Sequence, residues 1–254
     1  MLAKPGRASL ALGVLFLLAL GFAAFTFLNS PYFRLERIDV LGASRVPEQE
    51  IRAFAGVKPG ESLLRIRPDR VAAEVSKNPW VKEVRVRRVL PGKLEISVVE
   101  REPLARIPYY GFFVSVDAQG VALALVEGAP AADLAIVTGV NSSQVILGQP
   151  YPSPMLPSAL SCLSNLSPEA RRLISEVHLG DKGELTMYTL DGVTIRVGQD
   201  GDLQAKMKLL EAMLQEARNK KLSLEYIDLR YDGKPVSKPR NHPCLLYTSD
   251  AADE

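Results

Sequence analysis

Histidine and cysteine, which often carry acid–base, nucleophilic or metal chemistry, are scarce in this chain of 254 residues. The two histidines are His178 and His242, and the two cysteines are Cys162 and Cys244. The chain contains no HExxH, CxxC or phosphate-loop pattern. A Ser-His-Asp system would have to use His178, which lies in the strand-like run SEVHL. An ordinary strand histidine is the simpler interpretation.

One carboxylate pair, Glu100 and Glu102, has the spacing of two groups that could share acid–base work. Arg101 and Arg106 flank the pair, so a solvated, charge-compensated strand end is the better interpretation. We therefore expect no catalytic residue, no metal, no cofactor and no small-molecule substrate.

A basic run, VKEVRVRRVL at residues 81–90, offers binding chemistry instead. Arg85 and Arg87 stand out in it, with Lys82 and Arg88 nearby. A solvated sheet face is the favoured interpretation, and contact with a partner or a lipid headgroup is the alternative. We keep Arg85 and Arg87 as candidate partner-binding residues.

The composition limits the classes of protein that the chain can belong to. Apolar residues make up 47% and charged residues 24%, which is enough for packed cores. The net charge of +2 argues against a dedicated nucleic-acid binder, because phosphate neutralisation needs a concentrated basic excess. We expect no nucleic-acid partner.

An apolar segment precedes the rest of the chain, because no residue from Ala8 to Leu28 is charged. At 1.5 Å per residue, a helix of this length covers about 31 Å, which matches the hydrocarbon core of a bilayer. A cleaved signal peptide is the alternative, but its apolar region would be shorter and would end in small residues. Phe25 and Phe27 stand where those small residues would be needed.

The flanking charges suggest an orientation for this segment. Lys4 and Arg7 precede it without acidic neighbours, which favours a cytoplasmic N-terminus, although arginines also follow it. We expect residues 1–7 to form a cytoplasmic tail, residues 8–28 to form a transmembrane helix, and everything after it to be extracytoplasmic.

The next seventy residues predict a small α+β unit. The expected order is strand 33–41, a short helix before Gly56, helix 68–76, strand 81–90 and strand 93–100. Leu94, Ile96 and Val98 share one face at the strand period. Pro91-Gly92 between the last two strands predicts a type II turn.

The remainder predicts a second, strand-rich unit. Expected elements are a hairpin at 114–123, a hairpin at 188–198, a helix at 203–217 and a terminal strand around 231–237. Asp191-Gly192 gives the second hairpin a two-residue turn signal. Residues 241–254, NHPCLLYTSDAADE, abandon the strand pattern and resemble translated sequencing-adaptor sequence, so we expect a non-native tail there.

The run NPWVKEVRVRRVLPGKLEISVVEREPLA, residues 78–105, closely resembles the end of the POTRA domain in the FtsQ/DivIB family. It has an aromatic-Val entry after Pro, a basic strand, a Pro-containing turn, a Val-x-Glu-Arg ending and then Pro-x-Ala. LAIVTG, residues 134–139, stands where that family has Leu-Pro-x-Ile-Thr-Gly, with Ala135 in place of the usual proline. The resemblance covers residues 8–240.

The resemblance implies an α+β fold class: an N-terminal transmembrane helix, a POTRA domain (β-α-α-β-β) at 31–101, and a β-rich domain with a mixed sheet and helices at 102–240. It implies a non-enzymatic, membrane-anchored scaffold of the divisome in the cell (inner) membrane at the division septum. That scaffold would link FtsB/DivIC-like and FtsL-like partners to septal peptidoglycan synthesis.

The terminal segment around 231–237 is the implied contact for the FtsB/DivIC partner, and Tyr231, Lys234 and Val236 are the positions carried over. An open sheet edge offers unpaired backbone groups to which a partner strand can add. Simple strand termination is an equal alternative, and Pro235 limits pairing on one side.

Two other functions remain open from the sequence. POTRA domains also serve as polypeptide-handling modules of protein export systems, but residues 106–240 are too short for the transmembrane barrel that usually follows. An anchored cell-wall enzyme would need the catalytic constellation that the sequence lacks.

Overall fold

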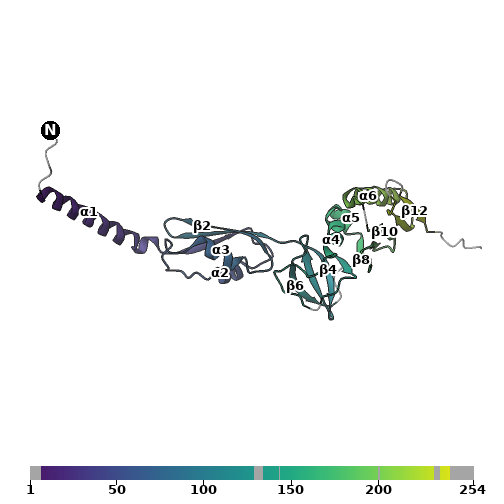
Figure 1. Cartoon of the computed structure of the whole chain (residues 1–254), viewed down its shortest axis with the longest axis horizontal. Helices are drawn as coiled ribbons and strands as arrows, with labels where there is room; N and C mark the ends of the chain where they lie inside the picture. Colours follow the sequence, from purple (N-terminus) through teal and green to yellow (C-terminus); the bar gives the residue numbers. More distant parts are fainter. Residues whose placement is uncertain (1–6, 129–133, 143, 200, 232–234, 241–254) are drawn as a thin grey trace, which may run out of the picture. The chain divides into compact units, whose positions relative to one another are not determined.

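The computed structural model describes residues 7–128, 134–142, 144–199, 201–231 and 235–240. The chain separates into two compact units, with the division after Arg101. The first unit begins with helix α1, Arg7–Leu28, and a short 3-10 helix η1, Pro31–Phe33, follows it (Figure 1). Among the described residues no helix is both long and apolar enough to cross a membrane. The predicted transmembrane helix therefore stays a prediction.

After η1, the first unit is one sheet covered by two helices. Its elements are β1 (Arg37–Leu41), α2 (Glu48–Ala55), α3 (Pro68–Val75), β2 (Val81–Val89) and β3 (Lys93–Glu100). The sheet order is β1-β3-β2, with β1 parallel and β2 antiparallel to the central β3. The predicted β-α-α-β-β order is what the structure has, although β1 begins later than expected because η1 occupies Pro31–Phe33.

The core of this unit lies between β3 and the two helices. Leu94, Ile96 and Val98 of β3 are buried, as their alternation predicts, and they pack with Ile51 of α2 and Val71 of α3. Each helix carries the boundary signals expected from its sequence. Proline occupies the first position of α3, and a left-handed glycine directly follows α2.

The turn between β2 and β3 differs from the prediction. A type II turn needs a positive φ at its glycine, and Gly92 does not have one, so that prediction is wrong. The glycine is needed for space instead, because a Cβ there would lie 2.7 Å from the carbonyl oxygen of Arg34. The peptide bond between Leu90 and Pro91 is cis.

The second unit is built on a mixed sheet of nine strands among the described residues, in the order β12-β11-β10-β9-β8-β7-β4-β5-β6. The strands are β4 (Pro103–Tyr109), β5 (Phe112–Asp117), β6 (Ala122–Glu127), β7 (Ala135–Thr138), β8 (Ile174–Leu179), β9 (Leu185–Thr189), β10 (Thr194–Gly198), β11 (Leu224–Asp228) and β12 (Val236–Pro239). The helices are α4 (Leu156–Ser164), α5 (Pro168–Arg171) and α6 (Leu203–Asn219).

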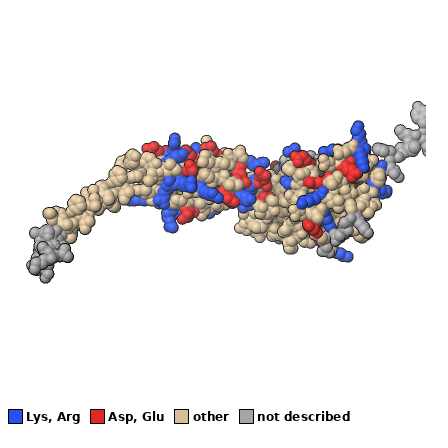
Figure 2. Space-filling model, turned by 90° about the horizontal axis from the view of Figure 1, so that it is seen from above, with Lys and Arg blue, Asp and Glu red and all other residues tan. Residues whose placement is uncertain are grey.

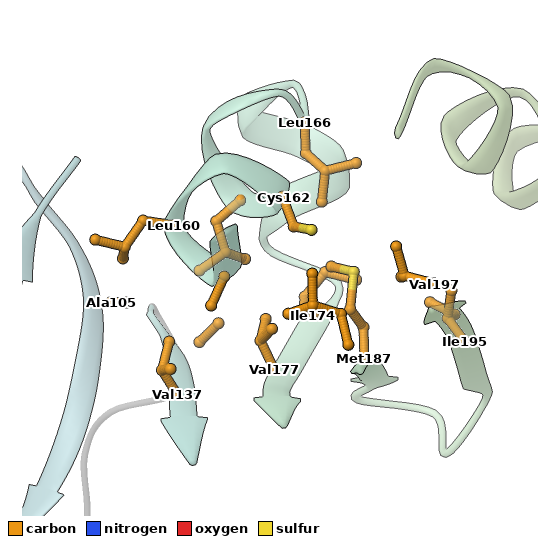
Figure 3. Close-up of a cluster of buried hydrophobic side chains, with 14 of the residues drawn as sticks. Ala105, Val137, Leu160, Cys162, Leu166, Ile174, Val177, Met187, Ile195 and Val197 are labelled. Carbon is orange, nitrogen blue, oxygen red and sulfur yellow. The ribbon is translucent and has the colours of Figure 1, made fainter. Parts of the chain in front are cut away.

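The three helices lie along one side of this sheet (Figure 1). Leu160 and Cys162 of α4 face Val137, Val177 and Met187 of the strands, and this cluster forms the centre of the core (Figure 3). The second hairpin has a three-residue loop, because Thr189 and Val193 on either side of it are hydrogen-bonded to each other. Only the glycine of the predicted Asp-Gly turn takes a positive φ.

Candidate functional site

The C-terminal strand β12 is one edge of the nine-stranded sheet. It pairs with β11 on one side, and no other strand of the described chain pairs with its second side. All four of its side chains are exposed, including Val236 at 49%. An edge of this kind presents backbone N–H and C=O groups to which an extended partner segment can add.

The predicted terminal strand, residues 231–237, begins later than expected, because pairing with β11 starts only at Val236. Tyr231 therefore precedes the strand, where 63% of its surface is exposed. Its ring lies 5.7 Å from the guanidinium carbon of Arg230. Lys234 lies outside the described residues, and the structure gives Tyr231 and Val236 no contact with each other among the residues it describes.

Asp228 and Arg230 fix the end of β11, on which this edge depends. Arg230 donates to both carboxylate oxygens of Asp228, with its closest contact at 2.6 Å. The hydrogen bond from Arg230 lowers the pKa of Asp228, although burial opposes the shift. The contact between Arg230 and Asp228 thus holds the end of β11 in place.

The basic strand β2 is an edge of the three-stranded sheet. Arg85 lies opposite Ser97 of β3, and Arg87 lies opposite Glu95, both on the face turned away from the helices. Arg87 therefore has a carboxylate as its cross-strand neighbour, while Arg85 has none directly opposite. Both arginines are exposed. Their position fits either a solvated face or a partner contact, so their role stays a prediction.

Glu100, which is partly exposed, makes contacts that its sequence neighbours do not indicate. It accepts hydrogen bonds from the backbone N–H groups of Ser44, Arg45 and Val46 and from the Ser44 hydroxyl, at 2.8–3.0 Å. Burial raises the pKa of Glu100, but these four donors outweigh burial and lower it to about 2. Glu100 therefore fastens the loop before α2 to the end of β3, a role that the sequence did not indicate.

His178 on β8 lies beside Thr138 on the neighbouring strand β7, with 2.8 Å between Nδ1 and the threonine hydroxyl. The same hydroxyl donates to Glu176 at 2.5 Å. The imidazole of His178 and the carboxylate of Glu176 thus meet at one threonine hydroxyl on the adjacent strand. Within the described ranges no group of His, Cys, Asp and Glu could hold a metal ion.

Two features of the second unit were missed by sequence reasoning. Strand β6 is the other edge of the nine-stranded sheet, and Leu125 on it is as exposed as Val236, at 49%. Gly139, in the Thr-Gly pair of residues 138–139, has φ +79°, and a Cβ there would lie 1.8 Å from the carbonyl oxygen of Leu179. The exposed edge at β6 could be found only from the order of the strands in the sheet. The close approach at residue 139 was signalled by the glycine itself.

The two units define a class of protein: a POTRA-type α+β domain followed by a β-rich domain with open sheet edges. The model of the POTRA domain, FtsQ-type, matches residues 33–101. The model of the C-terminal domain of cell division protein FtsQ/DivIB matches residues 105–230.

Individual relatives agree with these matches. The chain is 33% identical over 228 residues to cell division protein FtsQ of Geobacter sp. strain M21, covering 86% of this chain and 82% of that protein. It is 31% identical over 223 residues to FtsQ of Syntrophotalea carbinolica, covering 85% and 78%. It is 23% identical over 228 residues to DivIB of Clostridium botulinum strain Loch Maree, covering 88% of each. The chain belongs to the FtsQ/DivIB family of cell division proteins.

One solved structure is also similar, that of the major extracytoplasmic domain of DivIB from Geobacillus stearothermophilus. The identity is 17% and the TM-score 0.34, over 46% of this chain and 92% of that one. This likeness is too distant to support an argument about structure.

Proposed function

We propose that the chain is a non-enzymatic, membrane-anchored assembly protein of the divisome. It binds an FtsB/DivIC-like partner by strand addition to β12, and through it an FtsL-like partner, and so positions septal peptidoglycan synthesis. Membership of a cell division family and the open edge of β12 support this proposal. The single observation that carries it is the edge, because a fully exposed strand with one unpaired side is a ready acceptor for another strand.

Strand addition also assigns roles to the three candidate residues. Main-chain hydrogen bonds along β12 supply affinity, and alternate side chains supply specificity. Val236 contributes apolar contact area at the start of the strand. Tyr231, braced by Arg230, provides an aromatic anchor beside it, a residue type often found at the energetic centre of interfaces. Lys234 is proposed as a further polar contact.

Val236→Asp tests the edge. A charge that an added partner strand covers must be desolvated, so affinity for the extracytoplasmic part of an FtsB-type partner should fall at least about tenfold. Leu125→Asp is a matched control, because Leu125 is equally exposed at the opposite edge of the same sheet. Calorimetric titration of both variants, with melting curves to verify folding, shows whether the partner binds at the β12 edge or at the β6 edge. Unchanged affinity of the folded Val236→Asp variant rejects the proposal.

Anchoring rests on the sequence of the first helix. Residues 8–28 carry no charge, and the described large apolar side chains of α1, from Leu12 to Leu28, are exposed. We place residues 1–7 in the cytoplasm, residues 8–28 in the inner membrane, and the POTRA domain (31–101) and β domain (102–240) outside it. Alkaline phosphatase fused after Arg240 should be active in cells. Its inactivity, together with an active cytoplasmic reporter at the same site, would refute this topology.

The open β2 edge of the POTRA unit favours a second candidate function, namely polypeptide handling in a protein export system. The FtsQ-type match favours division instead. In either case Arg85 and Arg87 lie on the strand that a partner would contact. Fractionation discriminates between the two, because an export module of this kind would be recovered with the outer membrane.

A further inference from the structure

The end of the first unit that adjoins α1 is formed by three segments distant in sequence. Phe27 in the last turn of α1 packs edge-on against Phe33 of η1, with ring centroids 5.3 Å apart. The turn between β2 and β3 lies against the residues after η1, because the Gly92 carbonyl accepts from the N–H of Glu36 at 2.7 Å. The loop before α3 joins them, since Arg65 donates to the Asn29 side chain at 3.0 Å.

Apolar side chains are exposed at this end. Leu90 and Val89 at the tip of the β2–β3 turn are 57% and 39% exposed, and Tyr32 of η1 is 61% exposed. None of them belongs to the core of the unit. Apolar residues at a turn tip, joined by a tyrosine, have the composition of segments that enter the interface of a membrane.

Basic side chains surround this apolar tip. Arg88 donates to the carbonyl of Leu64, directly beside Arg65, and Arg34 forms a β-bridge with Ser62 in the same loop. All three arginines are exposed. Figure 2 shows Lys and Arg side chains gathered over this unit.

The charge balance at this end is positive. Two acidic side chains lie in the same segments, Glu36 against Gly92 and Glu61 with its carboxylate on the N–H of Lys58. On the neighbouring strands β1 and β3, Arg37 and Lys93 both form ion pairs with Asp39. Among the residues named here, five cations thus stand against three carboxylates. Arginines that retain a surplus of charge next to an apolar tip suit an anionic lipid surface.

We propose that this end of the POTRA unit, formed by Tyr32, the Val89–Pro91 tip and the arginines 34, 65 and 88, rests on the anionic lipid surface from which α1 emerges. The proposal depends on the membrane anchoring proposed above. The apolar tip enters the interface while the guanidinium groups bind lipid phosphates, each of which can accept two hydrogen bonds from an arginine. Contact with the lipid thereby fixes the inclination of the POTRA unit to the membrane.

The opposite end of the same sheet provides an internal comparison. Val99, near the end of β3, is 51% exposed, similar to Leu90, but it lies six residues of strand beyond the turn. At about 3.3 Å per residue this separation is roughly 20 Å, which is greater than the depth of the headgroup layer. A probe at Leu90 should therefore contact lipid while a probe at Val99 should not.

The test uses the full chain, reconstituted into vesicles with a single nitroxide label at Leu90→Cys or Val99→Cys. Cys244 is replaced by serine, and buried Cys162 is left in place because its thiol is inaccessible. Vesicles are either pure phosphatidylcholine or an equal mixture with phosphatidylglycerol. Oxygen and nickel-complex accessibilities then report the depth of each label.

The expected result is an interfacial depth for the Leu90 label in anionic vesicles and an aqueous environment for the Val99 label. Replacing Arg34 and Arg88 by glutamine should reduce the ratio of Leu90 labels in the membrane interface to Leu90 labels in water about fivefold per arginine. Trp80 fluorescence verifies that the unit remains folded in these variants. A Leu90 label that is aqueous in anionic vesicles, or equally deep in neutral ones, overturns the inference and leaves the anchor intact. Failure of the chain to float with vesicles overturns the anchor itself.

Discussion

Replacing Glu100 by glutamine should destabilise the POTRA unit selectively, and the structure gives the magnitude. The carboxylate accepts three backbone N–H groups and one hydroxyl, which lower its pKa from 4.5 to about 2. At about 1.4 kcal/mol per pH unit, this difference corresponds to about 3 kcal/mol of folding free energy at neutral pH. The side chain is partly exposed, so solvent screening reduces the expected loss in Glu100→Gln to about 2 kcal/mol.

The pH dependence has a definite sign. Because the folded-state pKa lies below the unfolded-state value, the stabilisation is complete above pH 4.5 and is lost as the pH falls toward about 2. The difference between wild type and Glu100→Gln should therefore shrink across that window. Trp80, the one tryptophan of the chain, lies in this unit, and its carbonyl accepts the N–H of Arg101. Its emission during urea unfolding therefore follows this unit alone.

Glu95→Gln is the matched control, because Glu95 is a half-buried glutamate on the outer face of the same strand. Its variant should change the unfolding free energy by less than about 0.5 kcal/mol. Equal stability of Glu100→Gln and wild type at pH 7, or a difference that persists undiminished at pH 2, would show that the four hydrogen bonds do not hold the loop as described.

A glycine substitution and a thiol reagent test the packing of the second unit. Gly139→Ala should lower the unfolding free energy by more than about 3 kcal/mol in thermal melts, because its Cβ would meet the Leu179 carbonyl. Gly111 is also at positive φ but has open space around it, so Gly111→Ala should lower the unfolding free energy by only about 1 kcal/mol. Equal losses in both would contradict the close approach. Cys162 is fully buried and its pKa is raised by burial to about 12, so a Cys244→Ser variant should react with Ellman's reagent only after unfolding. Rapid reaction of the native protein would refute that burial.

The POTRA unit could be predicted from the sequence because each of its elements carries a local signal. The alternation of Leu94, Ile96 and Val98 sets the buried face of β3, and Pro68 marks the start of α3. The turn at Gly92 could not be predicted in the same way. Its conformation depends on the backbone of Arg34, which is close in space but 58 residues away in the chain.

The second unit shows a different limit. Helix α4 carries buried residues at Leu156, Ala159, Leu160 and Leu163, the spacing of one helical face, but its short length and the prolines around it weaken that signal. The order of the strands in the sheet could not be predicted from the sequence. Parallel neighbours such as β4 and β7 are separated by a hairpin, and no local pattern states which strands end as edges.

The motifs that identified the family also differ in kind from the proposed binding site. Glu100 fastens a loop, Gly139 allows two backbones to meet, and Asp228 holds Arg230 at a strand end. Each needs a particular residue type because a buried or crowded contact demands it. A strand edge makes no such demand, since its main-chain groups are the same for any sequence. The residues easiest to recognise in this chain therefore hold its frame. The surface that we propose for partners is set by which strand ends the sheet. The family resemblance named its residues, and the folded arrangement of β12 beside β11 shows the edge itself.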